Sequence, residues 1–147
     1  MTSTAQVTWV AGMQFVAEAG SGHAIVLDGA PSVGGRDTGA RPLELLLMGL
    51  AGCTAMDVIF ILKQRMRQQV TGLEVKVSAE RAAHHPKVYT EIHIQYIVRG
   101  RGLAEKKVRR AIEMSETTFC SASAMLGKTA KIDYTYEIIE EGEHGGE

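Results

Sequence analysis

The sequence has little of what marks a secreted or membrane-bound protein. Two cysteines among 147 residues are too few for a disulfide scaffold. The first Lys or Arg is Arg36, so the basic region that precedes the apolar core of a secretory signal is missing. A net charge of -1 gives no electrostatic reason to expect nucleic acid or an anionic membrane as partner. We therefore predict a cytoplasmic protein whose two cysteines are either inert packing or redox groups.

The rest of the composition is that of an ordinary globular chain. With 45% hydrophobic and 22% charged residues the chain can bury a core, and no shift in composition divides it. We expect a single domain over residues 1–147. Its end, residues 140–147, is acidic and rich in glycine, and this tail is predicted to be disordered.

Periodicity and turn residues predict the order of the elements. Alternating apolar residues indicate β-strands at residues 6–15, 23–27, 73–79, 88–98 and 131–139. Helical patterns occupy residues 43–62, 103–118 and 121–126. A glycine-rich loop fills residues 28–41. The resulting order, ββ-α-ββ-α-α-β with antiparallel hairpins, indicates an α+β fold.

The segment 43–62 is apolar on nearly every side, and Pro42 favours a helix start there. Its length would suit a membrane span. Glu44 and Asp57 are costly in lipid, however, and the helix runs on into the basic residues 63–67. In a soluble protein a helix that is apolar all round must be enclosed by the rest of the fold. We therefore predict a long buried central helix, no membrane contact, and a second subunit that helps to cover this helix.

The two cysteines differ in their expected reactivity. A thiol reacts as thiolate, so a reactive cysteine needs a nearby cation or helix N-terminus. Cys53 lies about three turns into its helix, and Asp57 on the same face would raise its pKa. Considered alone, Cys53 resembles a small core residue. Cys120 precedes a short predicted helix, and its backbone donors favour Cys120 as the more acidic thiol.

A resemblance to a known family rests on the residues around these cysteines. They are the segments Pro42-Leu43-Glu44-Leu45, Gly52-Cys53-Thr54-Ala55-Met56-Asp57-Val58 and Phe119-Cys120. In them the chain resembles the OsmC/Ohr superfamily of osmotically inducible and organic-hydroperoxide-resistance proteins, as an OsmC-like side branch. The resemblance covers nearly the whole chain. It implies an OsmC-like fold and an intertwined homodimer in which sheets from both chains enclose the central helices.

The resemblance also implies a thiol-dependent peroxidase for organic hydroperoxides. Cys53 would attack the peroxide to form a sulfenic acid, and Cys120 would resolve it as a Cys53–Cys120 disulfide. A dithiol, such as a protein-bound lipoyl group, would then reduce this disulfide. Because Cys53 needs a cation, we predict that Arg36 or Arg41 stabilises its thiolate and that Glu44 orients that arginine. No cofactor is expected, and no metal site is expected from the scattered histidines.

Departures from the family pattern leave a second function open. Peroxidase branches carry an acidic residue at the position of Leu43 and an arginine near Met13 and Gln14. The alternative is a non-catalytic dimer that binds a small molecule or senses redox state on the same fold. A further alternative is that Cys53 and Cys120 are two buried thiols that never meet.

Overall fold

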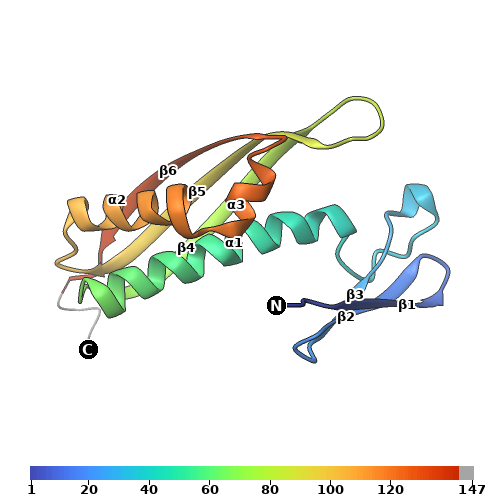
Figure 1. Ribbon diagram of the computed structural model, residues 1–147, viewed down its shortest axis with the longest axis horizontal. Helices are drawn as coiled ribbons and strands as arrows, with labels where there is room; N and C mark the ends of the chain where they lie inside the picture. Colours follow the sequence, from blue (N-terminus) through green and yellow to red (C-terminus); the bar gives the residue numbers. More distant parts are fainter. Residues whose placement is uncertain (143–147) are drawn as a thin grey trace. The chain divides into compact units, whose positions relative to one another are not determined.

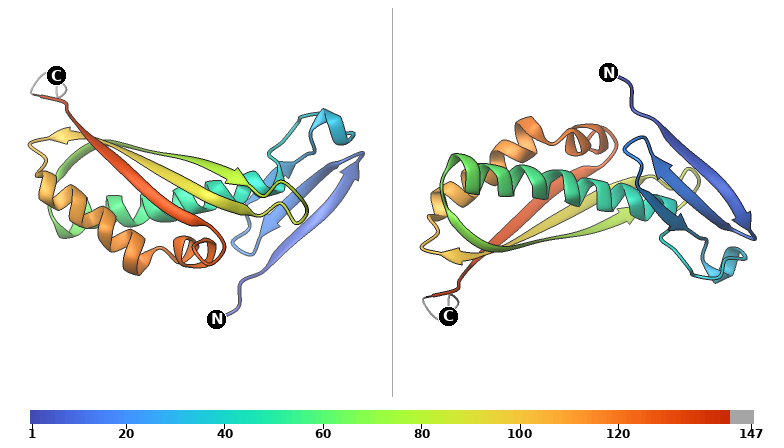
Figure 2. Two further views of the ribbon diagram at one scale, coloured as in Figure 1. Left: turned by 90° about the horizontal axis from the view of Figure 1, so that it is seen from above. Right: turned by 90° about the horizontal axis from the view of Figure 1, so that it is seen from below.

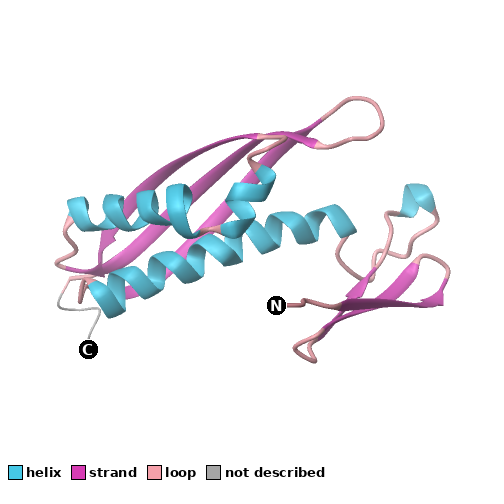
Figure 3. Cartoon of the chain, in the orientation of Figure 1, coloured by secondary structure: helices cyan, strands magenta, loops and turns pink. Residues whose placement is uncertain are grey.

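The computed structural model describes residues 1–142. They fall into two compact units, Met1–Leu47 and a second unit that begins at Met48. The N-terminal unit contains an antiparallel sheet with the order β1-β2-β3, drawn as magenta strands in Figure 3. Its strands are β1 (Ala5–Ala11), β2 (Gln14–Ala19) and β3 (Ala24–Leu27). A 3-10 turn at Pro31–Val33 interrupts the following loop. The unit ends within the first residues of α1 (Pro42–Phe60).

Alternation predicts one strand over residues 6–15, whereas the structure has two strands joined by a tight turn. Gly12 adopts a left-handed backbone with φ of 58°, and Gly12 and Met13 form the turn between β1 and β2. Ala11 therefore pairs with Gln14. Glycine suits this backbone because it has no Cβ. The prediction was wrong because apolar residues continue through the turn and hide it.

Asp28 organises the loop that follows β3. Its carboxylate accepts hydrogen bonds from the backbone N–H groups of Gly29 at 2.7 Å and of Arg36 and Thr38 at 3.2 Å each. The Thr38 hydroxyl donates a further one. These donors, with the Thr38 hydroxyl first, lower the pKa of Asp28, which is 2% exposed. The predicted loop 28–41 is therefore held together by hydrogen bonds to the Asp28 carboxylate.

The C-terminal unit contains a second sheet with the order β4-β5-β6 (Figure 1). β4 (Gln69–Arg81) pairs antiparallel with β5 (Tyr89–Arg101), as the alternation predicts. β6 (Lys131–Glu140) instead runs parallel to β5. The parallel pairing follows from the connection between them, in which α2 (Glu105–Met114) and α3 (Ser121–Leu126) cross back along the sheet. Figure 2 shows these helices on the same face of the sheet.

Two helices end in a wider π-helical turn that the periodicity does not predict. After α1 the turn covers Ile61–Arg65, and after α2 it covers Ser115–Phe119. α3 occupies the residues predicted for it. The predicted tail begins at Glu140, which is instead the last residue of β6. Residues 143–147 of that tail lie outside the described part of the chain.

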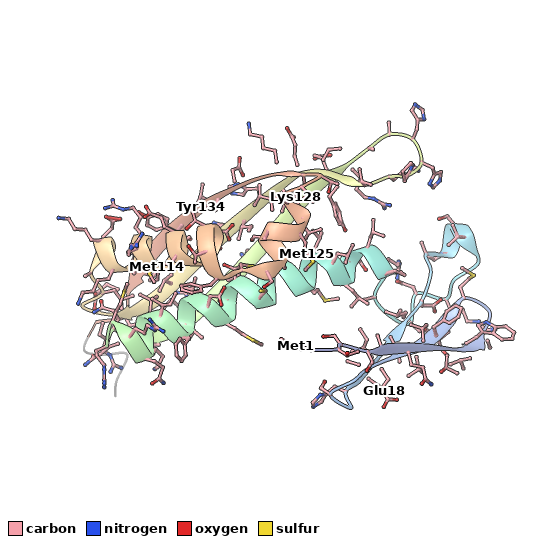
Figure 4. The ribbon with its side chains drawn as sticks, viewed as in Figure 1. Met1, Glu18, Met114, Met125, Lys128 and Tyr134 are labelled. Atoms are coloured by element: carbon pink, nitrogen blue, oxygen red, sulfur yellow. The ribbon has the colours of Figure 1, made fainter. Side chains whose placement is uncertain are left out.

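The core of the C-terminal unit lies between its sheet and its helices. The inward side chains of β5 meet one side of α1 and of α2. The residues of these three elements that are at most 1% exposed are Ile92, Ile94, Tyr96 and Val98 of β5, Leu50, Thr54 and Val58 of α1, and Val108, Ala111 and Ile112 of α2. Tyr134 of β6, labelled in Figure 4, packs edge-on against Tyr96 with ring centroids 6.1 Å apart. Each large apolar side chain buried here stabilises the fold by about 1.5–3 kcal/mol.

Helix α1 is buried along one stripe in a single chain. Leu50, Thr54 and Val58 form this stripe, whereas Met56 and Phe60 are 73% and 53% exposed. Enclosure of the helix on all sides, as expected for a homodimer, therefore needs a second chain and stays a prediction. By length and composition alone the helix and its π-helical turn, Pro42–Arg65, could cross a membrane, a property that core helices of soluble proteins share.

Candidate functional site

Cys53, Asp57 and Cys120 converge in the C-terminal unit. The two sulfurs and a carboxylate oxygen of Asp57 all lie within 4.8 Å of one another. Cys53 and Asp57 share a face of α1 because residues four apart lie one above the other on a helix. Cys120 comes from the segment between the π-helical turn and α3. The two thiols are therefore near neighbours, and a disulfide between them stays a prediction.

The π-helical turn positions Cys120. Its backbone N–H donates to the carbonyl of Ser115 at 2.8 Å, a bond over five residues, and the chain then becomes extended at Cys120. From there α3 begins, and the N–H of Ser123 donates to Cys120 Sγ at 3.4 Å. Such turns often occur at functional sites because they re-aim one side chain. Here the turn directs the Cys120 sulfur toward α1.

The two thiols differ in solvent access. Cys120 is buried, with 3% of its surface exposed, whereas Cys53 is half-buried. Burial is the largest influence on Cys120 and raises the pKa of its thiol, although Ser123 opposes this effect. Ser123 supplies the backbone donor that the sequence predicts for Cys120 at the start of α3. Burial nevertheless raises the pKa of the Cys120 thiol by more than this donor lowers it.

A group of hydroxyls surrounds the Glu116 carboxylate beside the cysteines. The Tyr96 hydroxyl donates to Glu116 at 2.6 Å, and the hydroxyls of Thr54 and Ser123 donate at 3.3 Å each. Burial, followed by the bond to Glu116, raises the pKa of Tyr96 far above its usual range. Tyr96 therefore remains a neutral hydrogen-bond donor at any physiological pH.

The same hydroxyls continue to Asp57. Thr54 Oγ1 lies 2.6 Å from the Tyr96 hydroxyl and 2.7 Å from Ser115 Oγ. Ser115 in turn donates to Asp57 Oδ2 at 2.9 Å. Thr54 and Ser115 are fully buried. Sequence reasoning missed this network, although polar residues at core positions of two predicted helices were a signal for it.

A cavity of about 230 Å³ opens next to the cysteines. Phe60, Ile61 and Phe119 form its apolar lining, together with Arg65 and Asp57. Asp57 thus belongs both to the thiol cluster and to the wall of the cavity. A small molecule in this cavity would lie beside Asp57, one of the three members of the cluster.

The other predicted site residues belong to the N-terminal unit. The Arg41 guanidinium pairs with Asp37 at 2.7 Å and donates to the carbonyl of Gly39. Glu44 accepts the backbone N–H of Arg41 at 2.8 Å, as a side chain does when it caps a helix start. Arg36 is exposed, and its backbone N–H binds Asp28. A catalytic role for Arg36, Arg41 or Glu44 stays a prediction.

Two of the histidines, His23 and His93, make local contacts. His93 Nδ1 lies 2.6 Å from Asp133 and its Nε2 lies 3.0 Å from Thr135, whereas His23 contacts Ser21. Among residues 1–142 only Cys53, Asp57 and Cys120 form a group of three side chains that could hold a metal ion. That group contains no histidine, so the histidine pattern could not reveal it.

Comparison with known proteins links this architecture to a family. Residues 35–135 match the family described as OsmC-like protein. Protein YhfA of Escherichia coli (strain K12) is 40% identical over 135 residues, which cover 92% of this chain and 97% of YhfA. A hypothetical protein from Aquifex aeolicus VF5 has a structure with a TM-score of 0.83 at 27% identity, covering 96% of this chain and 98% of that one.

The fold extends to more distant proteins. An organic hydroperoxide resistance protein OsmC from Legionella pneumophila has a TM-score of 0.69 at 14% identity, covering 93% of this chain and 97% of that one. This likeness shows the fold alone. The family match spans most of the chain, and YhfA aligns over nearly the full length of both chains. The protein therefore belongs to the OsmC-like protein family, as the residues around Cys53 and Cys120 suggest.

Proposed function

We propose that the protein is a cysteine-dependent reductase of organic hydroperoxides. The observation that carries the proposal is the approach of the Cys53 and Cys120 sulfurs to within 4.8 Å. A disulfide needs its sulfurs about 2.0 Å apart, so closure requires a movement of less than about 3 Å. The name of the Legionella pneumophila protein with the same fold, organic hydroperoxide resistance protein, supports the same chemistry.

The reaction has three steps. The Cys53 thiolate attacks the outer oxygen of the hydroperoxide, the O–O bond breaks, and the alkoxide takes a proton and leaves as alcohol. The Cys120 thiol then attacks the sulfenic sulfur of Cys53, which forms the disulfide and releases water. A dithiol reduces this disulfide and is itself oxidised. A lipoyl group in the cytoplasm has the required chemistry.

Solvent access supports this division of roles. The attacking thiol must meet its substrate, and Cys53 is the more exposed of the two. Cys120 is buried, with a raised pKa, and its contact with solvent is small. It suits the resolving role, because that step needs a sulfur close by rather than one open to substrate. The apolar lining of the cavity beside Asp57 favours an organic hydroperoxide over hydrogen peroxide.

A homodimer belongs to the proposal. Met56 and Phe60 leave an apolar side of α1 exposed, and a Cβ added at Gly49 or Gly52 would meet nothing within 4 Å in the described residues. A second chain could therefore approach the helix closely and cover it. In that assembly Arg36 or Arg41, oriented by Glu44, would stabilise the Cys53 thiolate. Sedimentation velocity at micromolar concentration should show a dimer, and a monomer would contradict this part.

Single-turnover mass spectrometry tests the chemistry. One equivalent of an organic hydroperoxide should remove two hydrogens per chain from the reduced protein and release one equivalent of alcohol. Cys53→Ser should leave the remaining thiol unchanged, whereas Cys120→Ser should stop at a sulfenic acid on Cys53. The two variants serve as matched controls for each other. Steady consumption of peroxide by Cys53→Ser with excess dithiol would overturn the assignment.

One observation favours a second candidate, a dimer that senses redox state without turnover. The Asp57 carboxylate lies beside both sulfurs, and a carboxylate disfavours the thiolate that attack requires. A sensor would form the Cys53–Cys120 disulfide slowly and would resist reduction by dithiols. Repeated turnover with excess dithiol identifies the reductase, and oxidation that stops after one equivalent identifies the sensor.

A further inference from the structure

We propose that Cys53, Asp57 and Cys120 together bind a thiophilic divalent cation, for which zinc is the appropriate probe. Their three candidate ligand atoms lie within 4.8 Å of one another in one unit of the chain. This inference goes beyond the proposed peroxide chemistry, because it concerns the reduced thiols in the absence of any oxidant.

The geometry of the three atoms suits zinc. Zinc binds thiolate sulfur at about 2.3 Å, so two sulfurs at a tetrahedral zinc lie about 3.8 Å apart. The separation in the structure is at most 4.8 Å, so the cluster needs to contract by no more than about 1 Å. Three protein ligands leave a fourth position for water or another small ligand.

The identity of the donors sets the class of cation. Two cysteine sulfurs are soft ligands that favour zinc and similar transition metals over magnesium or calcium. Zinc would replace the two thiol protons, which leave to solvent, while Asp57 already offers an anionic oxygen. Two thiolates and one carboxylate around one divalent ion carry a net charge of about -1, so the cation removes most of the repulsion among them.

The neighbours of the cluster hold the ligands in place. Ser115 donates to Asp57 Oδ2 at 2.9 Å, which fixes the carboxylate and leaves its other oxygen available to a cation. The N–H of Ser123 donates to Cys120 Sγ at 3.4 Å and supports negative charge on that sulfur. Outer hydrogen bonds of this kind orient metal ligands and strengthen binding. One of the three ligands, Asp57, lies in the wall of a cavity.

Zinc and peroxide would compete for the same sulfurs. A thiolate bound to zinc has its lone pair engaged by the metal, and the two sulfurs are held apart at the ion. Zinc should therefore protect the reduced protein from disulfide formation. Bound zinc would thus act as a reversible block on the thiol pair.

The test is a titration of the reduced, metal-free protein with zinc under anaerobic conditions, in competition with a chromophoric chelator. We expect one zinc per chain and slower oxidation of the thiols by an organic hydroperoxide when zinc is bound. Cys53→Ser and Cys120→Ser should each abolish competitive binding. Asp57→Asn keeps both thiols and an acceptor for Ser115, and it should weaken binding about tenfold or more.

Asp133→Asn is the matched control for Asp57→Asn. It makes the same chemical change at an exposed aspartate that pairs with His93. Zinc affinity should be unchanged in this variant. A loss of affinity in Asp133→Asn, or full affinity in Cys53→Ser, would place the ion elsewhere and overturn the proposal. Full affinity in Asp57→Asn would also overturn it, since Asp57 is one of the three ligands.

The two proposals fail separately. Zinc binding without peroxide consumption by the metal-free protein would remove the reductase and leave the metal site. Peroxide consumption without zinc binding would remove the metal site and leave the reductase. Thermal melting of each metal-free variant shows whether it folds. If a cysteine variant does not fold, the zinc affinity of Asp57→Asn still tests the metal site.

Discussion

Asp28 and Asp57 each lie at the centre of a small polar structure, one in each unit of the chain. The carboxylate of Asp28 accepts four hydrogen bonds, three from backbone N–H groups and one from Thr38. Asp57 accepts a single hydrogen bond among the described residues, from Ser115, and its other neighbours are two sulfurs. Both oxygens of Asp28 accept hydrogen bonds, whereas one oxygen of Asp57 accepts none among the described residues.

This difference separates a structural carboxylate from a candidate functional one. A carboxylate has about four acceptor positions, and a buried one that already accepts four hydrogen bonds from its own loop has little capacity left for a ligand. Asp57 is half-buried beside a cavity and two thiols. We therefore expect changes at Asp28 to affect the order of the loop, and changes at Asp57 to affect chemistry and metal binding.

The largest expected effect is on the loop of the N-terminal unit. Asp28→Ala leaves the N–H groups of Gly29, Arg36 and Thr38 without their acceptor. Opening of residues 28–41 should become more frequent, and cleavage there by a protease should accelerate about tenfold or more. Limited proteolysis followed by mass spectrometry locates the cuts. Asp57→Ala is the control, and equal acceleration of loop cleavage in both variants would contradict the comparison.

The next effect concerns the hydroxyl network that leads to Asp57. Tyr96→Phe removes the donor to Glu116 and leaves a half-buried carboxylate with weaker partners. The free energy of unfolding should fall by about 1–3 kcal/mol, as for other hydrogen bonds to charged groups. Thermal or denaturant melting measures it. Tyr134→Phe makes the same change where the structure shows no hydrogen bond to the hydroxyl, and it should cost under about 0.5 kcal/mol.

Acid should weaken the loop that Asp28 holds together. The folded pKa of Asp28 lies below the value of 3.8 usual for an aspartate. Its contribution to stability is therefore complete above that value and disappears as the pH falls through the lower, folded pKa. The difference in stability between wild type and Asp28→Asn should be constant near neutral pH and shrink below about pH 4. A difference that stays constant down to pH 2.5 would contradict the role of Asp28.

Much of the fold could be predicted from the sequence, because it depends on local patterns. Pro42 and the apolar run after it predict the start of α1, and alternation predicts β4 and β5 in their pairing. The turn at Gly12 was missed because apolar residues continue through it. The direction of β6 was missed because strand direction depends on how the chain crosses the sheet, which periodicity does not specify.

The site could be predicted only in part. Motifs identified Cys53 and Cys120, and helical spacing placed Asp57 beside Cys53. The approach of Cys120 to Cys53 depends on a π-helical turn, and no pattern in the sequence predicts that turn. The raised pKa of Cys120 depends on burial by the whole unit. Burial in the tertiary structure, rather than the adjoining helix, sets the direction in which the pKa of Cys120 shifts.

The smallest expected effect on stability is at Asp57, and it is the one that completes the comparison. Asp57→Asn keeps an oxygen that can accept the Ser115 hydroxyl, so the free energy of unfolding should change by less than about 0.5 kcal/mol. Melting of the metal-free protein measures this change. If Asp57→Asn instead destabilises the fold by more than Tyr96→Phe does, Asp57 has a structural role in the hydroxyl network, as Asp28 has in its loop. A near-neutral result means that the carboxylate beside the two sulfurs contributes little to folding, as expected of a group whose second oxygen is free to bind a ligand.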